Sequence, residues 1–324
     1  MPFLPKQNQL IENGKLLPFG IYQDIIDNTD TSYFDEKGSL LAKNRRTERK
    51  AWIFFGVYSP EIICGIAVVD AGMAATAFCY FYSLKDSTFI EDKLTVPFGF
   101  EQAFNPNLYT DFKLKNYSIS HKNGKWKMEY NGKFNLIIES ENNANGFSVV
   151  SPSQNRPFNF TYKNCCLPVS VQINAGTNKT YAVSGNYGCI DYTKGYPPRE
   201  TRWNWLSFIG ITENKEPVGV NLVDKFNNNM ENVLWLKGEK IILSEAEFSM
   251  QKPLDKSDWL IATRDGILSC HMSPEGARSE NINALILKSN FTQPFGRIDG
   301  TITLNGITQK FTAFGVAEDH YAYW

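Results

Sequence analysis

The side chains best suited to chemistry gather between residues 188 and 205. This segment combines carboxylates, basic groups, tyrosines and tryptophans within eighteen residues. Because side chains on a β-strand alternate between its two faces, Trp203 and Trp205 are expected to share one face and form an aromatic wall. Asp191 is a candidate catalytic residue of this segment, since ionisable groups in apolar surroundings gather at functional sites. The neighbours expected to contact a substrate are Tyr192 and Arg199.

Two further segments combine acids with aromatic side chains. In 227–237, Glu231 precedes an apolar strand, and in 315–324, Asp319 and His320 stand among aromatic residues. A chain end is usually frayed and polar, so this aromatic terminus is typical of a buried strand. The candidate catalytic residues are Asp191, Glu231, Asp319 and His320. The remaining candidates for substrate contact are Asn221, Trp235 and Tyr321.

Each of these residues also has a purely structural interpretation. Asp191 and Asp319 could cap turns or pair with Arg199 or Arg202, and tryptophans in β-proteins mostly fill the core. Taken singly, the structural interpretation is favoured for any one residue. Taken as a set, the concentration of carboxylates among aromatic rings favours a functional site.

Several reaction classes lack their sequence signatures. The three histidines form no HExxH or HxH pair, so a zinc or iron site is not expected, although Cys270 and His271 could join a site assembled from distant strands. Neither GxxxxGK[ST] nor GxGxxG occurs, and no GxSxG elbow is present. Nucleotide-dependent and serine-hydrolase chemistry is therefore not expected, and we predict that the protein needs no metal and no cofactor.

Charge and cysteine content narrow the partners. The 33 basic and 34 acidic residues nearly cancel, which leaves no basic stripe for nucleic acid. No apolar run approaches the roughly 18 residues of a membrane span, and residues 1–20 lack a signal-peptide pattern. The six cysteines form no CxxC and only one adjacent pair, Cys165-Cys166, to which the sequence gives no role. We expect a cytoplasmic protein with reduced thiols, no stable membrane insertion, and an oligomeric state that stays open.

The elements that must position these residues are predicted to be short β-strands. Apolar or alternating runs of about 5–8 residues recur along the chain between turn signals, and no stretch shows a sustained helical period. The separators include Asn-Gly and Asp-Gly pairs, which tolerate the positive φ of tight hairpins. These pairs are Asn123-Gly124, Asn131-Gly132, Asp265-Gly266 and Asn305-Gly306. The pattern predicts antiparallel sheets that curl into barrels.

A weak internal repeat indicates that the fold is duplicated. The Trp52–Gly56 strand and the Gly65–Asp70 strand parallel Trp205–Gly210 and Gly219–Asp224. A second echo relates the segment ending in Asp191-Tyr192 to the one ending in Asp319-His320. We place the boundary near Pro197-Pro198, which predicts an N-terminal half of 1–196 and a C-terminal half of 197–324.

These motifs resemble the bacterial domain of unknown function 2804 family. The resemblance rests on Ile190–Gly195, Thr201–Trp205, Gly219–Asp224, Glu231–Leu236, Gln293–Gly296 and Gly315–His320, with similar stretches at Arg49–Asp70 and Ala77–Tyr80. It covers nearly the whole chain, and the family has no assigned reaction. More distantly, the arrangement is similar to the superfamily of carotenoid hydratases, tocopherol cyclases and lipocalin-like Diels–Alderases.

The resemblance implies two consecutive lipocalin-like antiparallel barrels with few short helices. In the hydratases, an acidic residue before a Trp-x-Trp strand is assigned the protonation of an alkene, and Asp191 matches that position. Tyr192 stands where the hydratase pattern tends to have histidine. We predict a cofactor-independent acid-catalysed isomerase, hydratase or cyclase that acts on a hydrophobic, unsaturated, lipid- or isoprenoid-like molecule in an aromatic cleft between the barrels. The alternatives are a non-enzymatic lipid or isoprenoid carrier and a structural protein whose cleft is filled.

Overall fold

The secondary structure is almost entirely antiparallel β. The computed structural model describes residues 2–36, 45–97, 112–122, 125–141, 145–176, 180–283 and 288–324. Within these ranges the helical segments are short: α1 (Ser32–Asp35), η1 (Arg45–Thr47) and η3 (Asn227–Asn229). The predicted all-β fold of two curled antiparallel sheets is confirmed. No helix in the described ranges is long and apolar enough to cross a membrane.

The chain divides into two compact units. The N-terminal unit comprises Pro2–Val57 and Cys64–Pro198, and the C-terminal unit comprises Tyr58–Ile63 and Arg199–Trp324. The domain ranges expected from the sequence, 1–196 and 197–324, stay a prediction.

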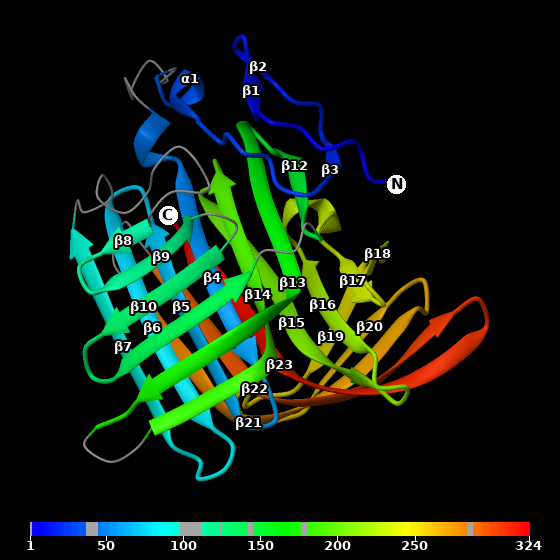
Figure 1. The fold of residues 1–324 in the computed structure, drawn as a ribbon. Helices are drawn as coiled ribbons and strands as arrows, with labels where there is room; N and C mark the ends of the chain where they lie inside the picture. Colours follow the sequence, from blue (N-terminus) through cyan, green and yellow to red (C-terminus); the bar gives the residue numbers. More distant parts are fainter. Residues whose placement is uncertain are drawn as a thin grey trace. The chain divides into compact units, whose positions relative to one another are not determined.

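The sheet of the N-terminal unit has the strand order β7-β6-β5-β4-β14-β13-β11-β10-β9-β8 among the described residues, and β12 joins β3 to β13 (Figure 1). A separate hairpin pairs β1 (Ile11–Glu12) with β2 (Lys15–Leu16). The strands of the sheet are β3 (Gly20–Gln23), β4 (Lys50–Tyr58), β5 (Ile62–Asp70), β6 (Ala74–Ser83), β7 (Phe89–Pro97), β8 (Phe112–Leu114), β9 (Tyr117–Lys122), β10 (Lys125–Asn131), β11 (Asn135–Glu141), β12 (Phe147–Ser153), β13 (Arg156–Asn174) and β14 (Thr180–Gly195).

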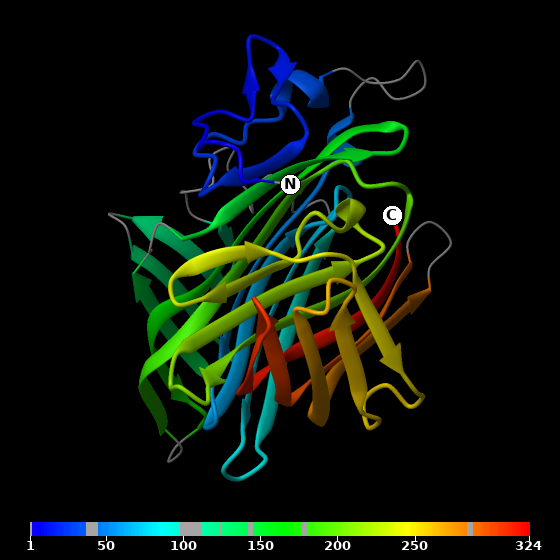
Figure 2. The same cartoon turned by 90° about the vertical axis from the view of Figure 1, so that its right-hand side faces the viewer.

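The sheet of the C-terminal unit has the order β18-β17-β16-β15-β23-β22-β21-β20-β19 among the described residues. Its strands are β15 (Glu200–Thr212), β16 (Pro217–Asp224), β17 (Val233–Leu236), β18 (Glu239–Ile242), β19 (Ala246–Met250), β20 (Trp259–Thr263), β21 (Leu268–Asn283), β22 (Lys288–Leu304) and β23 (Ile307–Tyr323). The strands at the two ends of this sheet run in clearly different directions, which shows its curl (Figure 2).

Both sheets share one topological rule, which matches the internal repeat. In the N-terminal sheet, β4 lies between β5 and the last strand, β14, and in the C-terminal sheet, β15 lies between β16 and the last strand, β23. Trp52 is on β4 and Trp205 is on β15. The first long strand of each half therefore pairs with both its successor and the end of that half.

Several strands are longer than the predicted 5–8 residues. β13 has 19 residues and β23 has 17. Bulges interrupt the apolar pattern without ending the strand: β13 shifts register between Asn164 and Leu167, and β21 shifts between Pro274 and Gly276. The predicted Asn305-Gly306 turn joins β22 to β23 with both residues at positive φ, 51° and 78°. The predicted turn at Asn123-Gly124 lies outside the described residues.

The core of the C-terminal unit identifies the face on which each side chain of β15 and β23 lies. Leu206 and Phe208 on β15 and Ala313 and Ala317 on β23 belong to this core. Because side chains alternate, even-numbered residues of β15 and odd-numbered residues of β23 face it. Trp203 and its face-mates therefore lie on the opposite face.

Candidate functional site

His320 lies between two aromatic rings on the face of the C-terminal sheet opposite its core. Trp203 on β15 is directly across from His320 on β23, and Phe291 on β22 is across from it on the other side. The imidazole centroid is 4.1 Å from the Trp203 ring and 5.2 Å from the Phe291 ring. The His320 side chain is only 13% exposed. The register of three strands thus places a nearly buried imidazole between two aromatic rings.

Glu318 contacts this imidazole and lies two residues before His320 on the same face of β23. Its Oε1 accepts a hydrogen bond from Trp203 Nε1 at 2.9 Å and lies 3.0 Å from His320 Nδ1. Its Oε2 accepts from Gln293 Nε2 at 2.6 Å. Burial alone would raise the pKa of this carboxyl group, but the hydrogen bond and charge of His320, together with the Trp203 hydrogen bond, lower it below its ordinary value. Glu318 is therefore an ionised carboxylate at neutral pH.

A buried arginine extends the network behind Glu318. Arg278 on β21 is 3% exposed and donates from its guanidinium to Gln293 Oε1 at 3.1 Å. Its guanidinium carbon lies 5.5 Å from the centre of the Phe291 ring. The donors therefore run in one direction, from Arg278 to Gln293 and from Gln293 to Glu318.

The network also fixes the hydrogen positions on His320. An ionised carboxylate only accepts, so the Nδ1 that faces Glu318 must carry a hydrogen. The other ring nitrogen, Nε2, lies 3.2 Å from Ser289 Oγ on β22. Charged, His320 can donate a proton through Nε2, and neutral, it can accept one there. The arrangement is suited to proton transfer.

Asp319 points to the other face of β23, away from His320. Its Oδ1 accepts from Asn204 Nδ2 at 2.8 Å, and Asn204 Oδ1 accepts from Lys225 Nζ at 2.9 Å. Ala317, two residues before Asp319, belongs to the core, which identifies this face. Asp319 and His320 are adjacent in sequence, but the strand separates them.

An open hollow of about 570 Å³ lies beside these strands in the C-terminal unit. Both an aromatic and an acidic residue named above line it, Phe291 and Asp319. The rest of its lining is polar and consists of Ser279, Glu280, Asn281, Asn290 and Thr292.

Asp191 and Tyr192 belong to the N-terminal unit and also lie on opposite faces of their strand, β14. Asp191 Oδ2 is 2.5 Å from Lys163 Nζ, and both side chains are nearly buried. Tyr192 is fully buried, with its ring centroid 5.8 Å from Phe112 and 6.0 Å from Phe160. Burial raises the pKa of Tyr192 to about 12, so its hydroxyl stays protonated.

Three other predicted residues form a hydrogen-bonded chain in the C-terminal unit. Trp205 Nε1 donates to Asn221 Oδ1 at 2.9 Å, and Asn221 Nδ2 donates to the backbone carbonyl of Glu231 at 2.9 Å. The Glu231 carboxylate is 1% exposed and accepts from Asn227 Nδ2. Trp235 is buried on β17, across from Gly219 in the sheet. These hydrogen bonds connect β15, β16 and the segment before β17.

Arg199 and Tyr321, both predicted to contact a substrate, form cation–π pairs near the C-terminus. The Arg199 guanidinium lies 4.6 Å from the centre of the Tyr323 ring, and that of Arg202 lies 4.5 Å from the Tyr321 ring. Such pairs contribute about 0.5–1 kcal/mol at exposed sites. They help hold the last residues of β23 against β15.

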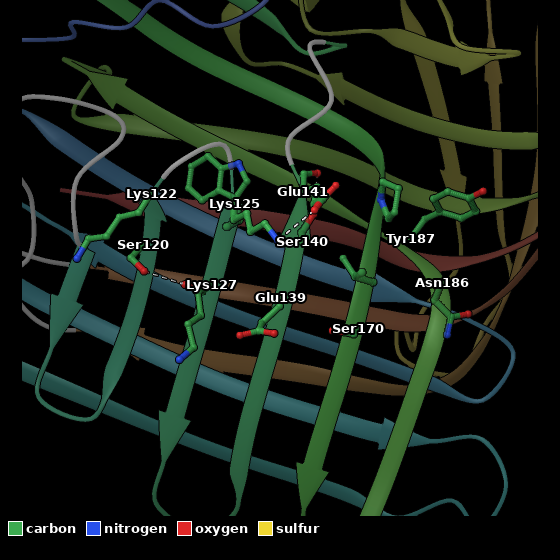
Figure 3. A pocket seen from close by; sticks show the side chains of 13 residues that line it. Ser120, Lys122, Lys125, Lys127, Glu139, Ser140, Glu141, Ser170, Asn186 and Tyr187 are labelled. Atoms are coloured by element: carbon green, nitrogen blue, oxygen red, sulfur yellow. Dashed lines mark hydrogen bonds and ion pairs between the residues drawn. The ribbon is translucent and has the colours of Figure 1, made fainter.

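The N-terminal unit has a hollow of about 690 Å³ on the sheet formed by β9, β10, β11, β13 and β14 (Figure 3). Its rim carries opposite charges, and Lys125 pairs with Glu141 at 3.2 Å. Lys127 pairs with Glu129 at 2.7 Å, which raises the pKa of that lysine. None of the predicted site residues lines this hollow.

Metal-binding geometry is not found among the described residues. No group of three or more His, Cys, Asp or Glu side chains in those ranges is arranged to hold an ion. His271 Nε2 lies 2.8 Å from Asp258 Oδ2, and Cys270 is part of the core of the C-terminal unit.

Sequence reasoning missed Glu318, Gln293 and Ser289. Glu318 could have been found from the sequence. The alternation of side chains that puts Trp203 and Trp205 on one face of their strand also puts Glu318 and His320 on one face of theirs. Gln293 belongs to a motif that carries the family resemblance, but nothing local assigned it to the site, and Ser289 gave no local signal. They reach the cluster only through the register of β22 against β23, where Phe291 faces His320.

The comparisons with known proteins agree with this architecture. The family described as "Domain of unknown function (DUF2804)" matches residues 4–324. No curated protein matches the sequence. The chain resembles the structure of an AttH-like protein from Nitrosomonas europaea, with 13% identity, a TM-score of 0.56, and coverage of 84% of this chain and 92% of that one.

Two further solved structures have the same fold. Kievitone hydratase from Nectria haematococca has 13% identity and a TM-score of 0.57, covering 94% of this chain and 98% of that one. CghA has 8% identity and a TM-score of 0.53, covering 98% and 96%, and a second structure contains CghA with Sch210972. At these identities the likeness shows the fold alone.

Proposed function

The chain belongs to the family described as a domain of unknown function (DUF2804), a description that names no reaction. We propose that it catalyses an acid–base reaction of a hydrophobic, unsaturated substrate. The reaction class is isomerisation, hydration or cyclisation, with His320 as the proton-transferring group. The observation that supports it is the His320 imidazole held by the ionised Glu318 between the rings of Trp203 and Phe291.

The chemistry follows from the surroundings of the ring. Protonating a carbon–carbon double bond requires a positioned acid, and general acid catalysis contributes roughly 10²–10⁴-fold to the rate. The cation that forms is stabilised by aromatic faces and by nearby negative charge. Trp203 and Phe291 supply the faces, and Glu318 supplies the charge. An apolar substrate also fits these walls better than a charged one.

Asp191 is the weaker candidate for the acid. Its carboxylate is 2.5 Å from the Lys163 ammonium. A neighbouring positive charge favours the charged form of a carboxylate, whereas alkene protonation needs a proton to give. His320 Nδ1 lies instead 3.0 Å from the Glu318 carboxylate, so this ring faces a carboxylate and not a cation.

The likeness to a hydratase supports the reaction class. Kievitone hydratase shares the fold over nearly the full length of both chains. The name of that enzyme denotes a hydration, and hydration of a double bond begins with a proton transfer of the proposed kind.

The test uses deuterium as the reporter. The protein is incubated in D2O with a mixture of unsaturated lipids and isoprenoids, and products are analysed by high-resolution mass spectrometry. Isomerisation or cyclisation introduces one deuterium, and hydration adds the mass of D2O. His320→Gln should reduce deuterium incorporation by about 10²–10⁴-fold.

His271→Gln is the matched control, because His271 is a half-exposed histidine of the same unit, paired with Asp258. It should retain wild-type incorporation. Equal incorporation in His320→Gln and wild type would contradict the proposal. Loss in Asp191→Asn instead would move the acid to the N-terminal unit.

A second candidate function is binding without turnover of a hydrophobic small molecule. The structure of CghA with Sch210972 favours it, because a protein of this fold is there associated with a small molecule. Native mass spectrometry of the purified protein tests it. A co-purified apolar ligand together with no deuterium incorporation would favour the carrier.

A further inference from the structure

Ser289, His320 and Glu318 stand in the order of a hydroxyl nucleophile, its base and the carboxylate that orients the base. Ser289 Oγ is 3.2 Å from His320 Nε2, and His320 Nδ1 is 3.0 Å from Glu318 Oε1. Both distances are within the reach expected for an activated hydroxyl in a structure without substrate. Such constellations are recognised by geometry rather than by sequence position.

We propose that Ser289 is a nucleophile for acyl transfer, with His320 as its general base, acting on esters of apolar carboxylic acids. This activity goes beyond the proposed proton transfer because it adds a covalent intermediate. It also departs from the sequence expectation, which disfavoured serine-hydrolase chemistry because no GxSxG elbow is present. That motif marks one fold, and β-strands can assemble the same groups differently.

The tautomer of His320 is the one that a base requires. The Glu318 carboxylate has no hydrogen to donate, so Nδ1 carries the hydrogen and the neutral ring offers its Nε2 lone pair to Ser289. Glu318 is itself held by Trp203 and Gln293. The orienting carboxylate therefore cannot easily turn away.

Two adjacent strands fix the positions of these residues. Phe291 is directly across from His320, so Ser289, two residues earlier on the same face of β22, is its diagonal neighbour. The rings of Trp203 and Phe291 limit rotation of the imidazole. Their apolar faces suit an aromatic or aliphatic acyl group.

The reaction balances with water as its only co-reactant. The Ser289 hydroxyl proton passes to His320 Nε2 as Oγ bonds to the carbonyl carbon. The bond from that carbon to the leaving oxygen breaks, and the leaving group takes the proton from Nε2 as an alcohol. Water then gives a proton to Nε2 as its oxygen bonds to the acyl carbon. The bond from that carbon to Oγ breaks, and Oγ takes the proton from Nε2, which releases the acid and restores the Ser289 hydroxyl.

The experiment labels the wild-type protein with a fluorophosphonate and maps the modified residue by peptide mass spectrometry. The expected result is covalent modification at Ser289, with hydrolysis of p-nitrophenyl butyrate that the label abolishes. Ser289→Ala should lose both signals, and Ser269→Ala, an exposed serine of β21, should keep both. Because the mapping uses the wild-type chain, a variant that fails to fold does not affect it.

Glu318 is a positioning residue here, and its test needs a readout that simple packing would not move. In wild type, the labelling rate should rise with pH, as general-base catalysis requires. In Glu318→Gln the rate should fall by about a hundredfold or more while Ser289 remains the labelled residue. In His320→Gln the rise with pH should disappear.

No label at Ser289, under conditions that fully label a known serine esterase, would overturn the proposal. Ester hydrolysis unchanged in Ser289→Ala would do the same. The two proposals fail separately. Deuterium incorporation that depends on His320, without a fluorophosphonate label at Ser289, would support the proton transfer only. A label at Ser289 without deuterium incorporation would support the nucleophile only.

Discussion

Replacing Glu318 with glutamine should destabilise the protein through the direction of its hydrogen bonds. The wild-type carboxylate accepts from three donors, on Trp203, His320 and Gln293. A glutamine keeps one acceptor oxygen for Trp203 and His320 but presents an NH2 group to the NH2 of Gln293. Gln293 cannot escape by flipping its amide, because its oxygen already accepts from Arg278.

The size of the effect follows from these contacts. One buried donor left without an acceptor costs about 1–3 kcal/mol, and two bonds lose their charge assistance at roughly 1 kcal/mol each. We expect Glu318→Gln to lower the free energy of unfolding by about 3–5 kcal/mol, which for a chain of 324 residues corresponds to roughly 4–7 °C in melting temperature. Urea and thermal unfolding followed by tryptophan fluorescence measure it.

Two further variants make the prediction sharp. Asp319→Asn, on the opposite face, keeps an acceptor for Asn204 and should cost at most about 1 kcal/mol. The double variant Glu318→Gln with Gln293→Glu restores the direction of donation, since the new carboxylate would accept both from Arg278 and from the new amide. It should recover most of the lost stability. Equal losses in Glu318→Gln and Asp319→Asn, or no recovery in the double variant, would refute the reasoning.

Three other predictions concern ionisation. Because the pKa of Glu318 is lowered on folding, its contribution is fully present above the unfolded-state value of about 4.3 and is lost as pH falls, so the stability difference between wild type and Glu318→Gln should shrink in urea titrations below that pH. Burial lowers the pKa of Lys194 to about 7, so between about pH 7 and 10.4 the unfolded chain binds more protons than the folded protein. In that range the free energy of unfolding of wild type, relative to that of Lys194→Met, should rise by up to about 1.4 kcal/mol per pH unit. Lys85→Met, at an exposed lysine, should show no such rise. Burial raises the pKa of Cys166 to about 12, so an aromatic disulfide reagent at pH 8 should react only slowly with this thiol in the native protein. In urea the same reagent should react with all six thiols, and fast stoichiometric reaction of the native state would contradict this prediction.

The strand pattern and its turns could be predicted from local sequence, because they depend on alternation and on residues that accept positive φ. Val218–Val223 lies within β16, and Asn305-Gly306 forms the hairpin between β22 and β23. Strand length could not be predicted, because the bulge at Cys165-Cys166 breaks the apolar period while the ladder continues beyond it. The partners of Glu318 were equally hidden, since Gln293 reaches it from 25 residues away through pairing register alone.

The register also shows that the two sheets differ at the positions around Glu318 and His320. Trp52 pairs with Thr193 on β14, and Trp205 pairs with Glu318 on β23. If the two tryptophans correspond, as the repeat indicates, Thr193 takes the place of Glu318 in the N-terminal half.

The next two residues continue the same correspondence. Lys194 pairs with Ala51 as Asp319 pairs with Asn204, and Gly195 pairs with Lys50 as His320 pairs with Trp203. The sequence echo that matched Asp191 with Asp319 is therefore displaced by three residues from the structural one. A glycine where the other half has its imidazole cannot move a proton, so the N-terminal half lacks the imidazole–carboxylate pair at this position.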